Sequence, residues 1–262
     1  MRAAHVAALL AGAALIPSAL AAQSGDRLAE RLARESARTV SFHFEVAPDV
    51  TVCDRGFHRR SDGPGTVRWD SRGQEESCPG GPLEVVVERR GDRVVEIDFG
   101  AVDARRANAD LGRIDPAEAA DWLLSLADRD ADTDAAEDAL AGATVARGVQ
   151  PAPRLLDLAR DRAVHRDIRR NALFWVSQIA ADGIDESLVG IAADAADDQE
   201  VRDMAVFALS QRPDEQAVPA LMDLVRTAPH AQTRRSALFW LAQSDDTRVP
   251  DFFAALITGS GG

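Results

Sequence analysis

The sequence predicts a mainly α-helical fold, in which an α-solenoid of stacked helix pairs follows a small, disulfide-linked β-rich domain. Three observations predict it. Apolar and polar residues alternate between about positions 40 and 100, apolar residues recur at helical spacing after about position 109, and the helical part repeats every 32 or 33 residues. The 262 residues are enough for one large domain or two modest ones.

Residues 1–21 have the pattern of a secretory signal peptide. Arg2 supplies the positive charge at the start, Val6–Ile16 is apolar, and Ala19-Leu20-Ala21 fits a small-x-small cleavage site. The apolar segment has about 15 residues at most, whereas roughly 20 are needed to span a bilayer. We therefore expect an extracytoplasmic protein, periplasmic or secreted, that starts at Ala22 and has no membrane span after signal removal; a retained anchor is the alternative. All 30 basic residues are arginines, which with the abundant alanine indicates a GC-rich, bacterial source.

Residues 22–108 are predicted to form the β-rich domain, which starts with a helix over 26–37. Runs with period two predict half-buried strands because successive side chains of a strand point to opposite faces. These runs cover residues 40–46, 83–88 and 95–99, and a shorter strand is predicted over 66–69. Arg90-Gly91-Asp92 fits a hairpin turn, and the segment 56–81, rich in Gly, Pro, Ser and Arg, is predicted to be a loop.

The two cysteines of the chain, Cys53 and Cys78, both lie in this domain. In an oxidising compartment an even pair predicts a disulfide rather than a catalytic or metal site. Closing a loop of about 25 residues contributes on the order of 3.5 kcal/mol in the chain-entropy model. The alternative, a Cys–His nucleophile with the nearby His58, would need a free thiol.

Residues 109–258 are predicted to form the helical repeat, and residues 259–262 a flexible tail. Ala172, Ala205 and Ala237 are 33 and 32 residues apart, and Ala139 lies 33 residues before the first of them. One amphipathic helix pair cannot bury its apolar face alone, so neighbouring units are expected to stack with these alanines at close helix contacts. The partner helices repeat in step, with Leu155 and Leu158 corresponding to Leu188 and Ile191, Leu221 and Leu224, and Phe253 and Leu256.

The segment Asp198–Leu209, followed by Ala217–Leu221, resembles a HEAT-like repeat of the phycobilisome-lyase type. The resemblance covers roughly residues 115–258 and implies an α-solenoid. Proteins of the lyase type attach bilins in the cytoplasm, which conflicts with a signal peptide. Resemblance to the HEAT-like deoxyhypusine hydroxylases would require repeated His-Glu pairs to hold iron, and the sequence contains no His-Glu dipeptide.

Arg169, Arg202 and Arg234 share one column of the repeat. In related repeats such arginines bond acidic residues in the loop of the next unit, so the resemblance implies an inter-repeat ladder; binding of an anion is the alternative. His165, Asp198 and His230 share another column. Successive units stand about 10 Å apart, whereas ligands must lie within about 2 Å of one ion, so we expect solvated or helix-capping residues rather than a metal site.

Two further patterns bear on function. Phe174, Phe207 and Phe239 form a column that is either binding surface or inter-repeat core, and core is the favoured interpretation. Aspartates alternate along the chain from Asp128 to Asp134 as in a calcium loop, but the glycine at position six and the glutamate at position twelve of such a loop are missing. Calcium binding is therefore a minor alternative.

The formal net charge is −13, and residues 109–262 hold 15 arginines against 27 acidic residues. This balance argues against nucleic-acid binding and allows either a solvated acidic surface or docking of a basic protein. We expect an exported, non-enzymatic scaffold for protein–protein interaction, with no catalytic residue, no cofactor and no metal. The alternative is an envelope enzyme, or a small-ligand or metal-binding protein, with its site in the β-rich domain around His43, His58 and the arginine-rich loop.

Overall fold

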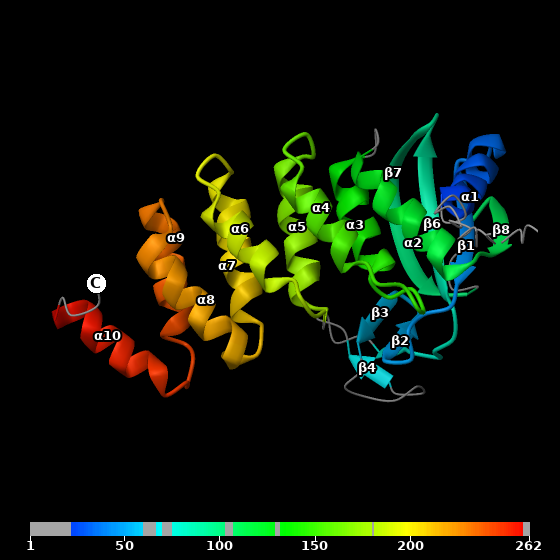
Figure 1. Cartoon of the computed structure of the whole chain (residues 1–262). Coiled ribbons are helices and arrows are strands. Elements are labelled where there is room, and N and C mark those ends of the chain that lie inside the picture. The colour runs from blue at the N-terminus through cyan, green and yellow to red at the C-terminus, as the bar shows by residue number, and fades with distance from the viewer. Residues whose placement is uncertain are drawn as a thin grey trace, which may run out of the picture.

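The computed structural model describes residues 22–59, 67–69, 75–102, 107–128, 132–179 and 181–258. A sheet region near the N-terminus is followed by helices in a row that extends away from the sheet to the last helix (Figure 1). The predicted signal peptide and the predicted tail lie outside the described residues. Within the part that is described, no helix combines the length and the apolar character needed to cross a membrane.

The main sheet has four strands in the order β7-β6-β1-β8. The central strand β1 pairs antiparallel with β6 and parallel with β8. Val40, Phe42 and Phe44 of β1 are fully buried, as the period-two pattern predicts. The strand bounds are Thr39–Phe44 for β1, Leu83–Arg90 for β6, Arg93–Ala101 for β7 and Ala109–Arg113 for β8.

The sheet extends past the boundary at residue 108 that the sequence predicts. Strand β8 begins at Ala109 and lies beside β1, so the first domain ends after Arg113. The leading helix α1 covers Ala22–Arg34 rather than 26–37. It ends early because the side chain of Arg89 bonds main-chain carbonyls beyond its last turn, including those of Glu35 and Ala37.

Two short ribbons lie in or next to the segment 56–81. Strand β2 (Val50–Cys53) pairs with β3 (Gly56–Arg59), and β4 (Val67–Trp69) pairs with β5 (Glu75–Ser77). Strand β4 of the second ribbon confirms the short strand that the sequence predicts over 66–69. The loop prediction is wrong for β3 and β5, because runs of three or four residues are too short to show a clear period. Most of the arginine-rich stretch between them lies outside the described residues. The Cys53–Cys78 disulfide is present and joins β2 to the chain beyond β5.

Helices follow the sheet in pairs. Helix α2 begins at Pro116, where the side chain of Asp115 accepts hydrogen bonds from two main-chain N–H groups of the first turn. Helices α3, α5, α7 and α9 contact one another in sequence, and α4, α6 and α8 form the neighbouring row. The bounds are Pro116–Ser125 (α2), Thr133–Ala143 (α3), Ala152–Arg160 (α4), Arg166–Ser177 (α5), Asp185–Ala193 (α6), Gln199–Ser210 (α7), Asp214–Thr227 (α8), Ala231–Leu241 (α9) and Arg248–Thr258 (α10).

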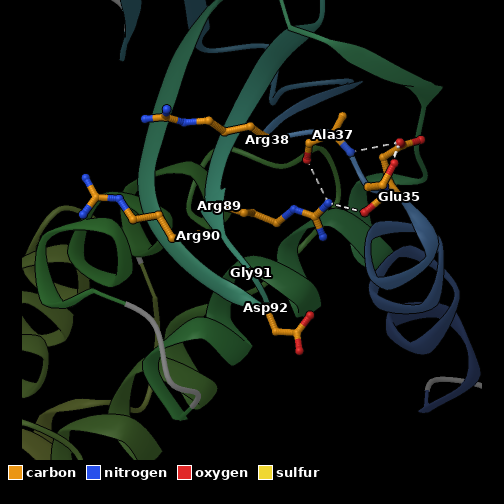
Figure 2. Close-up of a pocket in the computed structure, with 8 residues that line it drawn as sticks. Glu35, Ala37, Arg38, Arg89, Arg90, Gly91 and Asp92 are labelled. Carbon is orange, nitrogen blue, oxygen red and sulfur yellow. Dashed lines mark hydrogen bonds between the residues drawn. The ribbon is translucent and has the colours of Figure 1, made fainter.

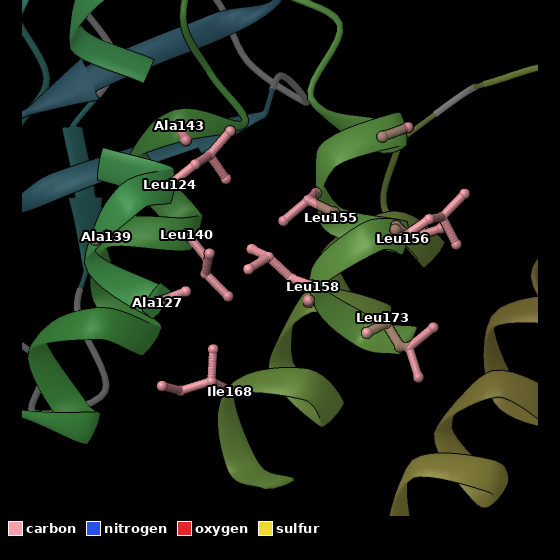
Figure 3. Close-up of a cluster of buried hydrophobic side chains, with 14 of the residues drawn as sticks. Leu124, Ala127, Ala139, Leu140, Ala143, Leu155, Leu156, Leu158, Ile168 and Leu173 are labelled. Carbon is pink, nitrogen blue, oxygen red and sulfur yellow. The ribbon is translucent and has the colours of Figure 1, made fainter. Parts of the chain in front are cut away.

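The alanine column marks the close contacts within the first row. Ala139, Ala172, Ala205 and Ala237 have no exposed surface. Leucines of the facing helices fill the space between the units, as Figure 3 shows for Leu140, Leu155 and Leu158. Burying each of these leucines contributes about 1.5–3 kcal/mol relative to leaving it exposed. Small residues in one column and large residues in the next therefore produce the stacking.

The sheet and the helical array share one hydrophobic core. Trp122 of α2 meets Phe42 of β1 edge to face, with ring centroids 5.6 Å apart. Gly142 of α3 lies directly against the ring of Phe99 on β7. The sheet therefore covers the first end of the array, a position at which a repeat would otherwise expose its apolar face.

The last repeat departs from the predicted register. Val249 and Phe252 of α10 are buried, whereas Leu256, which we align with Leu158, is 39% exposed. The buried pair of the last unit therefore lies about one helical turn before the predicted pair, Phe253 and Leu256. No helix follows α10 among the described residues, so its outer face lacks a packing neighbour and the apolar periodicity of the sequence overstates its burial.

Candidate protein-interaction surface

The residues of the predicted histidine column all precede helices of the first row. His165, Asp198 and His230 are the N-cap residues of α5, α7 and α9. Nδ1 of His165 accepts a hydrogen bond from the main-chain N–H of Asp167 at 3.3 Å, and Nε2 of His230 lies 2.9 Å from the carbonyl oxygen of Ala195. Within the described ranges these three side chains form no metal-ligating group.

Arg169 makes the contact that the predicted ladder requires. Its side chain is only 2% exposed, and its Nη2 atom lies 2.5 Å from the carboxylate of Asp197, in the loop before the next helix of the row. Its Nε also donates to the carbonyl oxygen of Ala159 at 3.0 Å. The pair therefore links the α4–α5 unit to the α6–α7 unit.

The other two arginines of the column do not continue the ladder. Arg202 donates to the main-chain carbonyl of Asp197, and Arg234 donates to that of Ala228 at 2.6 Å, so each bonds the loop before its own helix. In the repeat alignment, Pro229 stands where the preceding unit has Asp197. Proline offers no carboxylate, and Arg202 has no acidic side chain to reach in the next loop. The prediction of a continuous ladder is therefore wrong.

The phenylalanine column is surface rather than core. Phe174 is 36% exposed, Phe239 is 56% exposed and Phe207 is half-buried. The interpretation as inter-repeat core fails because these side chains lie on the outward side of the first row, opposite the alanines. We call Phe174, Trp175, Phe207, Phe239 and Trp240 the aromatic row.

Ring contacts join the aromatic row into two groups, Phe174 with Trp175 on α5 and Phe207 with Phe239 and Trp240 on α7 and α9. The ring centroids of Phe207 and Trp240 are 5.3 Å apart across the contact between α7 and α9. Within single helices, Phe174 contacts Trp175 at 5.2 Å and Phe239 contacts Trp240 at 5.1 Å. The tryptophans are half-buried and support the more exposed phenylalanines, so the row is a pre-formed apolar surface rather than a set of free side chains.

Carboxylates lie one helical turn from the aromatic row. Asn171, one turn before Phe174, donates through Nδ2 to Glu137 on α3 at 3.2 Å. Asp203, one turn before Phe207, accepts a hydrogen bond from the hydroxyl of Ser236 on α9 at 2.7 Å. Acidic groups therefore border the apolar surface on α3 and α7. We did not single out Glu137 and Asp203 from the sequence, although the helical spacing of Asp203 and Phe207 was visible there.

The acidic groups at the sheet end of this surface repel one another. Burial raises the pKa of the Glu137 carboxyl, and Asp167 and Asp134 raise it further while Arg170 lowers it. Burial also raises the pKa of Asp138, and neighbouring carboxylates on α3 and β7 add to the shift. A cation placed here would be attracted by several carboxylates at once.

The aspartate run from Asp128 to Asp134 has structural roles in the part that is described. Asp128 pairs with Arg154 of α4, and Asp132 caps α3 by accepting a hydrogen bond from the N–H of Asp134 at 3.3 Å. Asp130 lies outside the described residues. Calcium binding here stays a prediction without support from the geometry.

The two histidines of the alternative site are placed differently. His58 lies on β3 beside the disulfide, with Nδ1 3.5 Å from Sγ of Cys53. His43 lies on β1, opposite Glu84 of β6, and does not belong to the cluster formed by His58 and the cysteines. The structure therefore brings His58, but not His43, to the cysteine pair.

A cleft of about 680 Å³ lies between the α1–β1 loop and the β6–β7 turn. Figure 2 shows Arg89 directed into the loop, whereas Arg38 and Arg90 point away from it. Arg89 donates to the carbonyl oxygens of Leu32 at 2.6 Å and Ala37 at 3.1 Å. Its guanidinium thus anchors helix α1 to the sheet, and the other arginines of the lining, Arg38 and Arg90, point away from the loop (Figure 2).

Residues 185–260 match the family model of HEAT repeats. The match covers helices α6 to α10, so this part of the chain is similar to HEAT repeats, which is consistent with a scaffold for protein interactions. A comparison with curated proteins found no match to the chain. The finer resemblance to the phycobilisome-lyase type stays a prediction.

Proposed function

We propose that this protein is an exported, non-enzymatic scaffold of the cell envelope that binds a protein partner through its helical array. The observation that carries the proposal is the aromatic row. Phe174 leaves about a third of its surface in water and Phe239 more than half, and each packs against a neighbouring tryptophan. Aromatic residues in such positions supply much of the binding energy at protein interfaces.

The charge around the row favours a partner with basic residues. Glu137 and Asp203 border it, and desolvation together with neighbouring carboxylates at its sheet end raises the pKa of Asp138. Basic side chains of a partner would relieve this repulsion, which is the kind of complementarity that speeds association and selects partners. Arg170 and Arg235, each four residues before an exposed phenylalanine, would set where acidic groups of the partner can lie.

Export is supported by the signal-like pattern of residues 1–21 and by the Cys53–Cys78 disulfide, because disulfides persist in oxidising compartments. A non-enzymatic role is supported by the HEAT-like repeats of residues 185–260. The sequence also lacks a nucleophile elbow, a phosphate-binding glycine loop and a dinucleotide fingerprint.

The test is affinity capture from envelope extract of the source organism with tagged protein starting at Ala22. The matched variants are Phe174→Ala with Phe239→Ala, and Ile257→Ala, which removes an exposed apolar side chain at the far end of the array. We expect a protein that the wild type and the Ile257 variant retain, that the double variant loses, and that high salt releases. An identical set of captured proteins for all three would refute the proposal.

A further inference from the structure

Reduction of the Cys53–Cys78 disulfide would leave two thiols beside an imidazole. Nδ1 of His58 lies 3.5 Å from Sγ of Cys53, and the ligand atoms of the three residues all lie within 4.8 Å of one another. Two thiolates and one imidazole form a typical ligand set for zinc. We propose that the reduced protein binds a thiophilic divalent ion such as Zn²⁺ through Cys53, His58 and Cys78.

The present separation of sulfur and nitrogen already suits such a site. With Zn–S near 2.3 Å and Zn–N near 2.0–2.1 Å, neighbouring sulfur and nitrogen ligands of a tetrahedral ion are about 3.5 Å apart. Two sulfur ligands are about 3.8 Å apart, and rotation of the cysteine side chains supplies that separation once the S–S bond is broken. The described residues offer no fourth ligand in this group, so the fourth position is left for water.

Main-chain hydrogen bonds hold the cysteine segments together without the disulfide. The N–H of Asp54 donates to the carbonyl oxygen of Ser77 at 2.9 Å. The N–H of Gly80 donates to the carbonyl oxygen of Val52 at 3.0 Å. These two bonds lie on either side of the cysteine pair, so the thiols produced by reduction stay near each other.

The position of His58 is also set by the backbone. In the β2–β3 ribbon Cys53 lies opposite Gly56, which makes His58 the diagonal neighbour of Cys53 on the same face. The adjacent Phe57 packs edge to face against Phe99 of β7 at 5.5 Å and fixes the ribbon to the main sheet. All three ligands are therefore placed before a metal arrives, as an efficient site requires.

The imidazole of His58 is poorly satisfied in the disulfide form. Its Nε2 atom is buried and has no hydrogen-bond partner among the described residues. Its Nδ1 faces only a disulfide sulfur, which is a weak acceptor. Buried polar groups are normally hydrogen-bonded, so a ring that lacks good partners in one state of the protein needs a reason. A metal bond in the reduced state would give Nδ1 a strong partner in place of the disulfide sulfur.

The redox step balances with a dithiol as reductant. The dithiol gives two electrons and two protons to the disulfide, the S–S bond breaks, and the reductant leaves as its own disulfide. Binding of Zn²⁺ then displaces the protons of the two thiols, so the ion binds as a dithiolate. A small-molecule disulfide reverses both steps: it takes two electrons from the dithiolate and two protons from water, the Cys53–Cys78 bond forms again, and the ion is released.

The test uses the full chain in its oxidised form and after reduction with a phosphine under nitrogen. Titration with Co²⁺ should give a thiolate-to-cobalt charge-transfer band at one ion per chain in the reduced protein only, and Zn²⁺ should abolish the band by displacement. Equal Co²⁺ binding by the oxidised protein, or no band after reduction, would overturn the proposal.

His58→Ala tests the third ligand, and its fold can be checked by circular dichroism while the disulfide is intact. We expect at least a tenfold loss of Co²⁺ affinity in the reduced variant. His165→Ala, which removes an exposed histidine far along the chain, should leave the affinity unchanged. If His58→Ala binds Co²⁺ as tightly as the wild type, the cysteines act as a loose thiol pair and the proposed site does not exist.

Discussion

Arg169 and Asp197 form an ion pair whose disruption should destabilise the helical array. The two side chains are 2% and 4% exposed, and 2.5 Å separates Nη2 from the carboxylate oxygen. Replacing Asp197 by alanine leaves the buried guanidinium with only Asp198 as a counter-charge, and that carboxylate is half exposed and lies 3.8 Å from Nη1. Removing one partner of such a pair costs about 3–5 kcal/mol, which corresponds to a fall in Tm of roughly 6–20 °C for a chain of this size.

The assay is thermal and urea unfolding of Asp197→Ala, followed by far-UV circular dichroism. Arg162→Met is the matched control, because Arg162 pairs with Asp194 in the same loop but is half exposed. Its cost should stay below about 1 kcal/mol. The double variant Arg169→Met with Asp197→Leu should recover much of the loss, since apolar residues can replace a buried pair.

Two outcomes of these unfolding measurements would contradict the prediction. If Asp197→Ala lowers Tm no more than Arg162→Met, the pair carries no more stability than a surface ion pair. If the double variant is as unstable as the single one, the loss arises from the shape of the loop rather than from the uncompensated charge.

Three further predictions concern charge and packing. Partial desolvation and neighbouring carboxylates raise the folded-state pKa of Asp138, so its charge costs stability at neutral pH. Asp138→Asn should therefore raise Tm slightly at pH 7, and the gain should vanish below the ordinary pKa of 3.8, where the carboxyl is protonated in both states. Hydrogen bonds from Arg248 lower the pKa of Asp246 to about 2, so Asp246→Asn should reduce Tm at pH 7, and the difference should disappear as the pH falls from 3.8 through 2. Gly142→Ala would place Cβ 2.5 Å from the ring of Phe99 and should cost about 1–3 kcal/mol in urea unfolding; Phe99→Leu in the same chain should relieve part of the cost.

The repeat is the part of the fold that could be predicted most fully. Each unit is a local pair of helices, so one column of small residues and one of leucines specify both the helices and their contacts. Ala172, Ala205 and Ala237 are buried as this logic requires. The register was lost only in α10, where Val249 and Phe252 are buried and no later helix imposes the column.

The candidate surface was harder to predict. The spacing of Phe174, Phe207 and Phe239 places them on one face, but periodicity alone does not say whether that face meets a neighbour or water. Likewise, the column of Arg169, Arg202 and Arg234 predicts an inter-repeat ladder. Each contact of such a ladder also needs a carboxylate in the loop of the next unit. Pro229 stands in place of that acid, so a column of arginines predicts inter-repeat contacts only where the next loop also carries an acidic residue.

The sequence by itself determined the elements whose cause is local: the alternating strand around Phe42, the helix pairs, their period and the pairing of the two cysteines. Only the tertiary structure decided which elements meet. It placed β8 beside β1, the ring of Phe99 against Gly142, and His58 against Cys53. The physical reason is that periodicity reports which side of an element avoids water, while the neighbour that covers that side is chosen by packing over the whole chain.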